Sequence, residues 1–164
     1  MATEDQWAFC AKCAKLFFNG FDSKGRCAKG GPHDGNVSLP YFLFHSVNAR
    51  PNQLNGFRFC FKCQSLYWQK DLDEFHGDGS TLGVCPAGGG HGAEPSLPYL
   101  LDRDLGQPHG EHKWFACIRC NCVTHGPEGD RACAADTDND GVIGHVVGKL
   151  DNDHPLLLVR FVND

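Results

Sequence analysis

The sequence predicts an all-β protein built from three copies of one unit. Composition is the first reason: 20 glycines and 9 prolines in 164 residues break up long helices, while 12 phenylalanines, 3 tyrosines and 3 tryptophans favour strands. Second, no stretch has the hydrophobic period of an amphipathic helix, whereas short aromatic or β-branched runs lie between turn-forming residues. Third, one motif order recurs, starting at Cys10, Cys60 and Cys117, which are 50 and 57 residues apart.

The first copy contains W-x-F-C-x-K-C at residues 7–13, L-F-F at 16–18, C-x-x-G-G-x-H at 27–33 and S-L-P-Y at 38–41. The second copy repeats this order of motifs from Phe57 to Tyr99 and inserts a polar, glycine-rich loop at 71–83. The third copy keeps the same order of motifs from Trp114 onward, but its sequence has diverged. We therefore expect a single domain, 1–164, with repeats at about 5–50, 55–105 and 112–164.

Each copy contributes three predicted strands. They are residues 7–9, 16–18 and 41–44; 57–59, 66–68 and 99–101; and 114–116, 142–147 and 156–162. Units of about 50 residues cannot each bury a core, so we expect them to share one around a pseudo-threefold axis. This predicts a β-trefoil-like barrel, with a linear string of three metal-binding units as the alternative.

The cysteines predict zinc sites that staple each repeat. Each copy has three at equivalent positions, an odd number that cannot pair within a unit. A C-x-x-C turn places two thiolates on one side, a third cysteine returns from the next loop, and a histidine six residues later completes the Cys₃His set that zinc prefers. The first two sets are Cys10, Cys13, Cys27 and His33, and Cys60, Cys63, Cys85 and His91. A redox motif would need a following helix, which the sequence does not predict.

The fourth ligand of the third site is harder to identify from the spacing. The residue six past Cys133 is Asn139, which replaces a neutral imidazole poorly. If the preceding acidic segment is an insertion, His145 takes the place of the earlier histidines, with His125 and Cys122 as alternatives. The predicted third set is Cys117, Cys120, Cys133 and His145, for a total of about three zinc ions.

The acidic segment itself is a D-x-D-x-D-G pattern, the first half of a calcium loop. Its carboxylates are Asp136, Asp138 and Asp140. The twelfth position is Val147 rather than glutamate, and no helix is expected on either side, so an ordinary EF-hand is not predicted. A Ca²⁺ loop closed by Asp151 or Asp153 and a solvated acidic turn both remain open.

Charge and length restrict the function. A net charge of −5 argues against a module that holds nucleic acid mainly by charge, and three zinc thiolate sites would take it to about −8. No run approaches the roughly 18 apolar residues of a membrane span, and residues 1–7 do not resemble a signal peptide. We expect a cytoplasmic protein without a membrane span, with non-classical export as the alternative.

A non-enzymatic binding module is predicted, because closed four-ligand sites leave no coordination position for a reactive water and no catalytic motif is present. The expected ligand is a carbohydrate or a protein surface. Loops that differ between repeats usually carry such function. The candidate ligand-binding residues are Asp22, Trp68, Asp71, Asp73 and His76. A structural, self-assembling protein and a metal-buffering protein are the alternatives.

The repeated W-x-F-C-x-K-C, C-x-x-G-G-x-H and S-L-P-Y motifs resemble a bacterial cysteine and histidine repeat that occurs in threes and has no established role. The three-unit arrangement is also similar to the β-trefoil lectins of the ricin B type. Those lectins bind sugars in shallow pockets through an aromatic platform and an Asp or Asn. This chain lacks their Q-x-W signature, so the resemblance implies sugar binding by analogy of fold alone.

Overall fold

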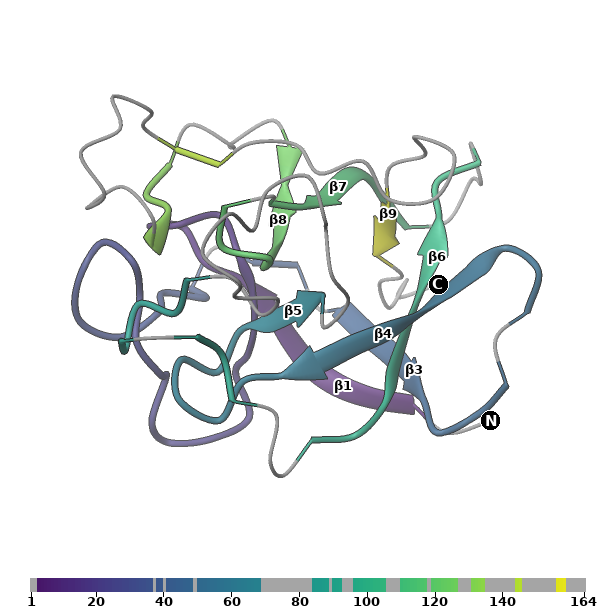
Figure 1. Cartoon of the computed structure of the whole chain (residues 1–164), viewed down its shortest axis with the longest axis horizontal. Coiled ribbons are helices and arrows are strands. Elements are labelled where there is room, and N and C mark those ends of the chain that lie inside the picture. Colours follow the sequence, from purple (N-terminus) through teal and green to yellow (C-terminus); the bar gives the residue numbers. More distant parts are fainter. Residues whose placement is uncertain are drawn as a thin grey trace.

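The computed structural model describes residues 3–36, 38–39, 41–48, 50–68, 84–88, 90–92, 96–105, 110–117, 119–126, 131–134, 144–145 and 156–158. Within these residues every named element is a β-strand, as predicted (Figure 1). The same residues contain no helix of the length and apolarity that would cross a membrane.

Each repeat contributes a first strand, a short hairpin partner and a return strand. The strands are β1 (Thr3–Phe9), β2 (Leu16–Phe18) and β3 (Tyr41–His45); β4 (Gln53–Phe59), β5 (Leu66–Trp68) and β6 (Tyr99–Arg103); and β7 (Glu111–Ala116), β8 (Val123–His125) and β9 (Leu156–Leu158). The hairpin partner strands β2 and β5 have the predicted bounds. In the third repeat the hairpin partner is β8, not the predicted strand at 142–147, whose described residues Gly144 and His145 lie outside any strand.

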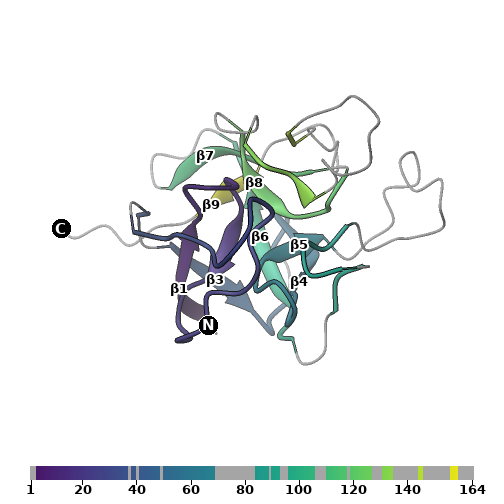
Figure 2. The same cartoon turned by 90° about the vertical axis from the view of Figure 1, so that its left-hand side faces the viewer.

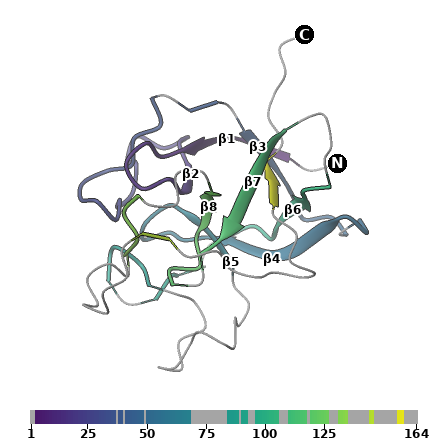
Figure 3. The same cartoon turned by 90° about the horizontal axis from the view of Figure 1, so that it is seen from above.

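The nine strands form one sheet, in which six strands curl into a nearly closed, barrel-like arrangement (Figures 1 and 2). The pairing order is β2-β1-β3-β6-β9-β7-β8, and β4 pairs with both β5 and β6. Viewed from above, β7 lies beside β9, and β4 crosses toward β6 (Figure 3). A single sheet through all three repeats does not fit a linear string of independent units.

The short hairpins also join the repeats in a ring. Backbone hydrogen bonds run from Phe18 N to Gln64 O (2.9 Å), from Trp68 N to Asn121 O (2.8 Å), and from His125 N to Ala14 O (3.0 Å). Each bond leads from one repeat to equivalent positions in the next, and the third returns to the first. This ring holds the three C-x-x-C turns close together.

A β-bulge in each first strand turns an aromatic side chain into the core. Gln6, Gly56 and Lys113 have positive φ of 69°, 101° and 70°, and the register of each strand shifts at this point. The next residue is an aromatic one that is at most 1% exposed: Trp7, Phe57 and Trp114. The extra bulge residue reverses the alternation of the strand, which brings the three rings into one core.

The serine of each S-L-P-Y motif ties the return strand to the first strand. Ser38 Oγ accepts a hydrogen bond from the backbone N–H of Phe9 (2.8 Å) and donates one to Leu39 O (2.6 Å). Ser96 accepts the equivalent bond from Phe59 N (2.8 Å). Both return strands therefore start from a fixed position.

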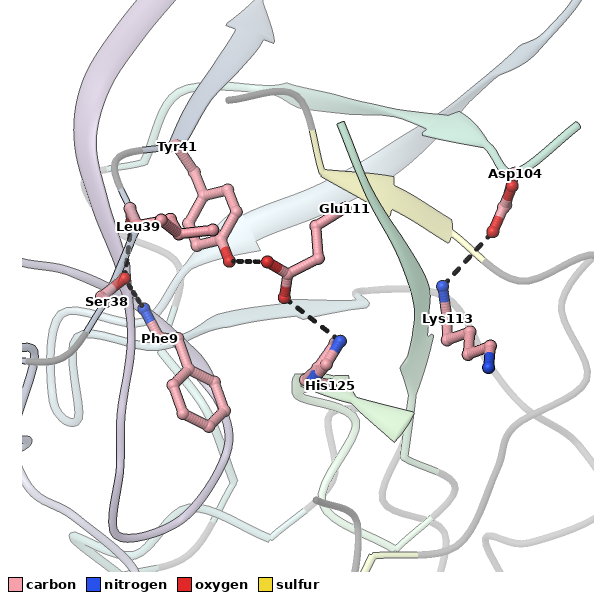
Figure 4. Close-up of polar contacts among 8 residues, drawn as sticks. All are labelled: Phe9, Ser38, Leu39, Tyr41, Asp104, Glu111, Lys113 and His125. Carbon is pink, nitrogen blue, oxygen red and sulfur yellow. Dashed lines mark hydrogen bonds and ion pairs between the residues drawn. The ribbon is translucent and has the colours of Figure 1, made fainter. Parts of the chain in front are cut away.

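The tyrosine of the same motif reaches a neighbouring repeat. Tyr41 donates to Glu111 Oε2 (2.7 Å; Figure 4), and Tyr99 donates to Glu4 Oε1 (2.7 Å). At the third junction both equivalent positions are leucines of the core. Both tyrosines of this motif thus have a charged acceptor, and at the junction where the tyrosine is absent the acid is absent as well.

Candidate metal centres

The structure gathers the predicted ligands into three clusters of one histidine and three cysteines. They are Cys10, Cys13, Cys27 and His33; Cys60, Cys63, Cys85 and His91; and Cys117, Cys120, Cys133 and His145. In each cluster the four ligand atoms lie within 4.8 Å of one another, and every ligand is buried except His145, which is half-buried. Among the described residues, these are the groups that could hold a metal ion.

The C-x-x-C turns are closed by a residue in the left-handed region. Ala14, Gln64 and Asn121, each directly after the second cysteine, have φ of 64°, 62° and 61°. Their backbone N–H groups donate to the carbonyl of the first cysteine at 2.7 to 2.8 Å. This conformation holds both thiols of the turn on the same side, which is the arrangement that two ligands of one metal require.

A basic residue inside each turn fastens the loop that carries the remaining ligands. Lys12 Nζ donates to Gly30 O (2.6 Å) and Pro32 O (2.8 Å). Lys62 makes the equivalent two bonds, and Arg119 donates to the carbonyl directly before the third histidine (2.7 Å). Sequence analysis did not identify this role, although the first two C-x-x-C turns have a lysine at the same position, which could have indicated it.

The distances fit a tetrahedral zinc ion. With zinc–sulfur bonds of about 2.3 Å and zinc–nitrogen bonds of about 2.0 to 2.1 Å, two sulfurs lie roughly 3.8 Å apart and a sulfur and a nitrogen roughly 3.6 Å apart. The first and third cysteines have their Sγ atoms 3.9 Å apart in all three clusters. The second cysteine lies 3.5 to 3.6 Å from the histidine Nδ1. These sulfurs are too far apart for disulfides, and none of the ten cysteines forms one.

Each histidine is oriented by the following repeat. The Nε2 atoms lie near backbone carbonyls: His33 near Cys63 O (2.9 Å), His91 near Cys120 O (2.7 Å) and His145 near Cys13 O (2.8 Å). A carbonyl accepts but cannot donate, so Nε2 keeps its proton and Nδ1, which faces the cysteines, is the nitrogen that can bind a metal. The three sites are thereby linked in a ring, each histidine resting on the C-x-x-C turn of the next site.

Stacked rings fix two of these histidines further. Phe17 lies parallel to His33 with centroids 4.7 Å apart, and Tyr67 lies parallel to His91 at 4.6 Å. Both come from the middle of a hairpin strand, which explains the L-F-F and L-Y-W motifs. The third repeat has Thr124 at this position, and its histidine is the more exposed one.

The thiolates also change the protonation of the histidines. Burial lowers the pKa of His33 and His91, but hydrogen bonds to the neighbouring cysteine thiolates outweigh it and raise the pKa of each to about 9. For His145, burial again lowers the pKa, and the charge of Cys120 leads the effects that raise it to about 10. At pH 7 a metal must therefore displace a proton from each imidazole.

A buried lysine lies between the three sites. Lys15 is 0% exposed, and its Nζ has no hydrogen-bond partner among the described residues. Burial lowers its pKa, but electrostatic interaction with the surrounding cysteines, Cys122 first and then the second cysteines of all three turns, raises it well above the usual value. The equivalent residues are Ser65 and Cys122, so a single positive charge serves three anionic clusters. Sequence analysis missed this residue.

The alternative ligands of the third site lie elsewhere. Cys122 Sγ is 3.5 Å from His91 Nε2, the nitrogen that faces away from the second cluster. His125 lies on β8, with its Nε2 3.1 Å from Glu111 Oε1 (Figure 4). Neither side chain belongs to a cluster, whereas His145 does.

Of the candidate ligand-binding residues that the structure describes, one lies in the core and one on the surface. Trp68 is only 7% exposed and packs in the core with its ring centroid 4.7 Å from that of Phe57. Asp22 is exposed in a bend after β2. Asp71, Asp73 and His76, and the candidate calcium residues Asp136, Asp138 and Asp140, lie outside the described residues.

Comparison of the chain with protein-family models, curated proteins and solved structures finds no match. What can be concluded about the chain therefore comes from its own geometry, which is an all-β, barrel-like sheet with three buried Cys₃His sites suited to zinc.

Proposed function

We propose that this protein is a non-enzymatic binding module whose fold is held together by three structural zinc ions. The observation that carries the proposal is the ring of closed Cys₃His sites, in which each histidine is hydrogen-bonded to the next C-x-x-C turn. Four protein donors complete a tetrahedral zinc ion, so no position is left for a substrate or an activated water.

The expected energetic role of zinc is structural. A structural zinc ion contributes an apparent 10 to 16 kcal/mol or so in small domains at neutral pH, compared with a net stability of about 5 to 15 kcal/mol for a whole domain. The thiols must also stay reduced to bind metal, which favours the cytoplasm or another reducing compartment as the location.

The finer architecture that we propose is a β-trefoil-like barrel with a pseudo-threefold axis. Equivalent residues pair in the same register at two junctions: Phe44 with Leu100 between β3 and β6, and Asp102 with Leu157 between β6 and β9. The ring of hairpin hydrogen bonds supports the same relation. On such a scaffold the metal sites gather near the axis and the loops face outward.

The ligand that we propose is a protein surface rather than a carbohydrate. Trp68, the aromatic residue among the candidate ligand-binding residues, lies in the core, where it has little area to offer a sugar. Phe21 and Phe61 are instead 51% and 52% exposed beside a cavity. Exposed apolar groups of this kind are typical of sites that bind proteins.

The test is elemental analysis of the purified protein combined with circular dichroism before and after chelation. We expect about three zinc ions per chain and loss of the β-sheet spectrum when zinc is removed. A protein that stays folded without zinc would favour metal buffering instead. Mass that grows with concentration in light scattering would favour self-assembly.

A further inference from the structure

Beside the second C-x-x-C turn, a cavity of about 530 Å³ opens where the first and second repeats meet. Its walls include Phe18, Phe21, Phe59, Phe61, Glu4 and Tyr99. The volume falls in the usual range for pockets that bind small molecules or single side chains.

The cavity is built from aromatic rings that the fold leaves partly open to solvent. The ring of Phe21 lies edge-on to those of Phe18 and Phe59, at centroid distances of 4.9 and 6.2 Å. Phe21 and Phe61 are each about half exposed. Ring faces carry partial negative charge, so such a cluster favours a cation in addition to apolar groups.

A carboxylate completes the lining. Glu4 Oε1 accepts the hydrogen bond from Tyr99, which fixes the acid at the cavity. Within the described part of the chain, no basic side chain forms an ion pair with Glu4. An acid held among phenyl rings complements a positively charged ligand.

The protein's own repeat shows which cation fits. Where the third and first repeats meet, Phe9 and Glu111 are equivalent to Phe59 and Glu4. There the guanidinium of Arg131 lies over the Phe9 ring, 5.6 Å from its centroid, and Nη1 donates to Ala11 O (2.6 Å). The acid, Glu111, faces Tyr41 and His125 (Figure 4). An internal arginine thus covers the ring that corresponds to Phe59.

The open cavity lacks this arginine because the position in the first repeat that is equivalent to Arg131 holds glycine. Arg131 stands two residues before Cys133, and Gly25 stands two residues before Cys27. Gly25 has φ of 70°, and a Cβ atom there would come within 2.3 Å of Cys63 O, a main-chain atom. The backbone at this junction therefore admits no side chain, and the rings of the cavity stay accessible from outside.

We propose that this cavity binds the guanidinium group of an arginine side chain from a partner polypeptide. The guanidinium stacks on Phe59 as Arg131 does on Phe9, and it pairs with Glu4. The net charge of −5 favours a basic partner. The inference rests on the proposed binding function and names the chemistry that the module recognises.

The test is an NMR titration of the zinc-loaded, full-length protein with N-acetylarginine amide. N-acetylcitrulline amide, which has nearly the same shape and no charge, is the matched ligand, and tetramethylammonium represents other cations. We expect saturable binding of the arginine derivative with a dissociation constant in the millimolar range, and at least tenfold weaker binding of the citrulline derivative. Glu4→Gln and Phe61→Ala should each weaken arginine binding severalfold, whereas Glu111→Gln at the closed counterpart should not.

Three results would overturn the assignment: no saturation by the arginine derivative, equal binding of citrulline, or tighter binding of tetramethylammonium. Zinc content and circular dichroism of each variant separate loss of the site from loss of the fold. A protein with three zinc ions that does not bind arginine would refute the cavity proposal alone. A zinc-free but folded protein that binds arginine would refute the zinc scaffold alone.

Discussion

Replacing the buried Lys15 by methionine tests whether one cation stabilises all three metal sites. Methionine is close to lysine in length and apolar, so Lys15→Met removes the charge with little change in volume. The ammonium lies among the second cysteines of the three C-x-x-C turns and makes no hydrogen bond to a described residue. Its contribution to stability is therefore electrostatic.

The size of the effect follows from burial and charge. A zinc ion with three thiolates and a neutral histidine carries one negative charge, so three filled sites carry three, which Lys15 partly balances. Removing one partner of a fully buried charge pair typically costs about 3 to 5 kcal/mol. For a chain of this size each 1 kcal/mol lowers the melting temperature by about 2 to 4 °C. We expect the melting temperature of Lys15→Met to fall by roughly 10 °C.

The assay is thermal unfolding followed by circular dichroism at fixed zinc and protein concentration. Lys29→Met is the control, because Lys29 is exposed and its loss should change the free energy of unfolding by less than about 0.5 kcal/mol. High salt should not abolish the difference, since buried charges are screened little. A Lys15→Met protein that is as stable as the parent, or more stable, would refute the electrostatic role.

Four further outcomes follow from the metal sites and the core. Chelation should abolish the β-sheet circular dichroism spectrum, and a retained spectrum would contradict a structural role for zinc. His145→Ala should lower the zinc content from three to about two per chain by elemental analysis, whereas Cys122→Ser should leave it at three. Because thiolates raise the pKa of His33 and His91 to about 9, zinc binding at pH 7 should release protons, and it should weaken as the pH falls. Calorimetry in two buffers of different ionisation enthalpy measures this proton release. Equal binding enthalpies in the two buffers would contradict it. Tyr99→Phe should lower the free energy of unfolding in urea by about 1.5 kcal/mol, because the hydrogen bond to a carboxylate is lost, and an unchanged midpoint would contradict this.

The amino-acid sequence alone determined the repeat, the all-β class and the members of the three ligand sets. These features are local, because a C-x-x-C turn and the loop that follows it bring three ligands together within one short segment. Even His145, separated from Cys133 by an acidic insertion, could be placed by its equivalence to the other histidines. The hairpin β8 was missed because its three residues, Val123–His125, gave a weaker β signal than the β-branched run at 142–147.

Only the tertiary structure decided how the repeats act on one another. The bond from His145 to Cys13 O joins residues 132 positions apart, and the position of Lys15 among three sites depends on closure of the whole ring. The cavity beside Glu4 likewise exists because Gly25 of one repeat packs on the backbone of the next. Spacing in the sequence fixes contacts within a turn, but contacts between turns depend on how three units close around a shared core, and no local pattern encodes that packing.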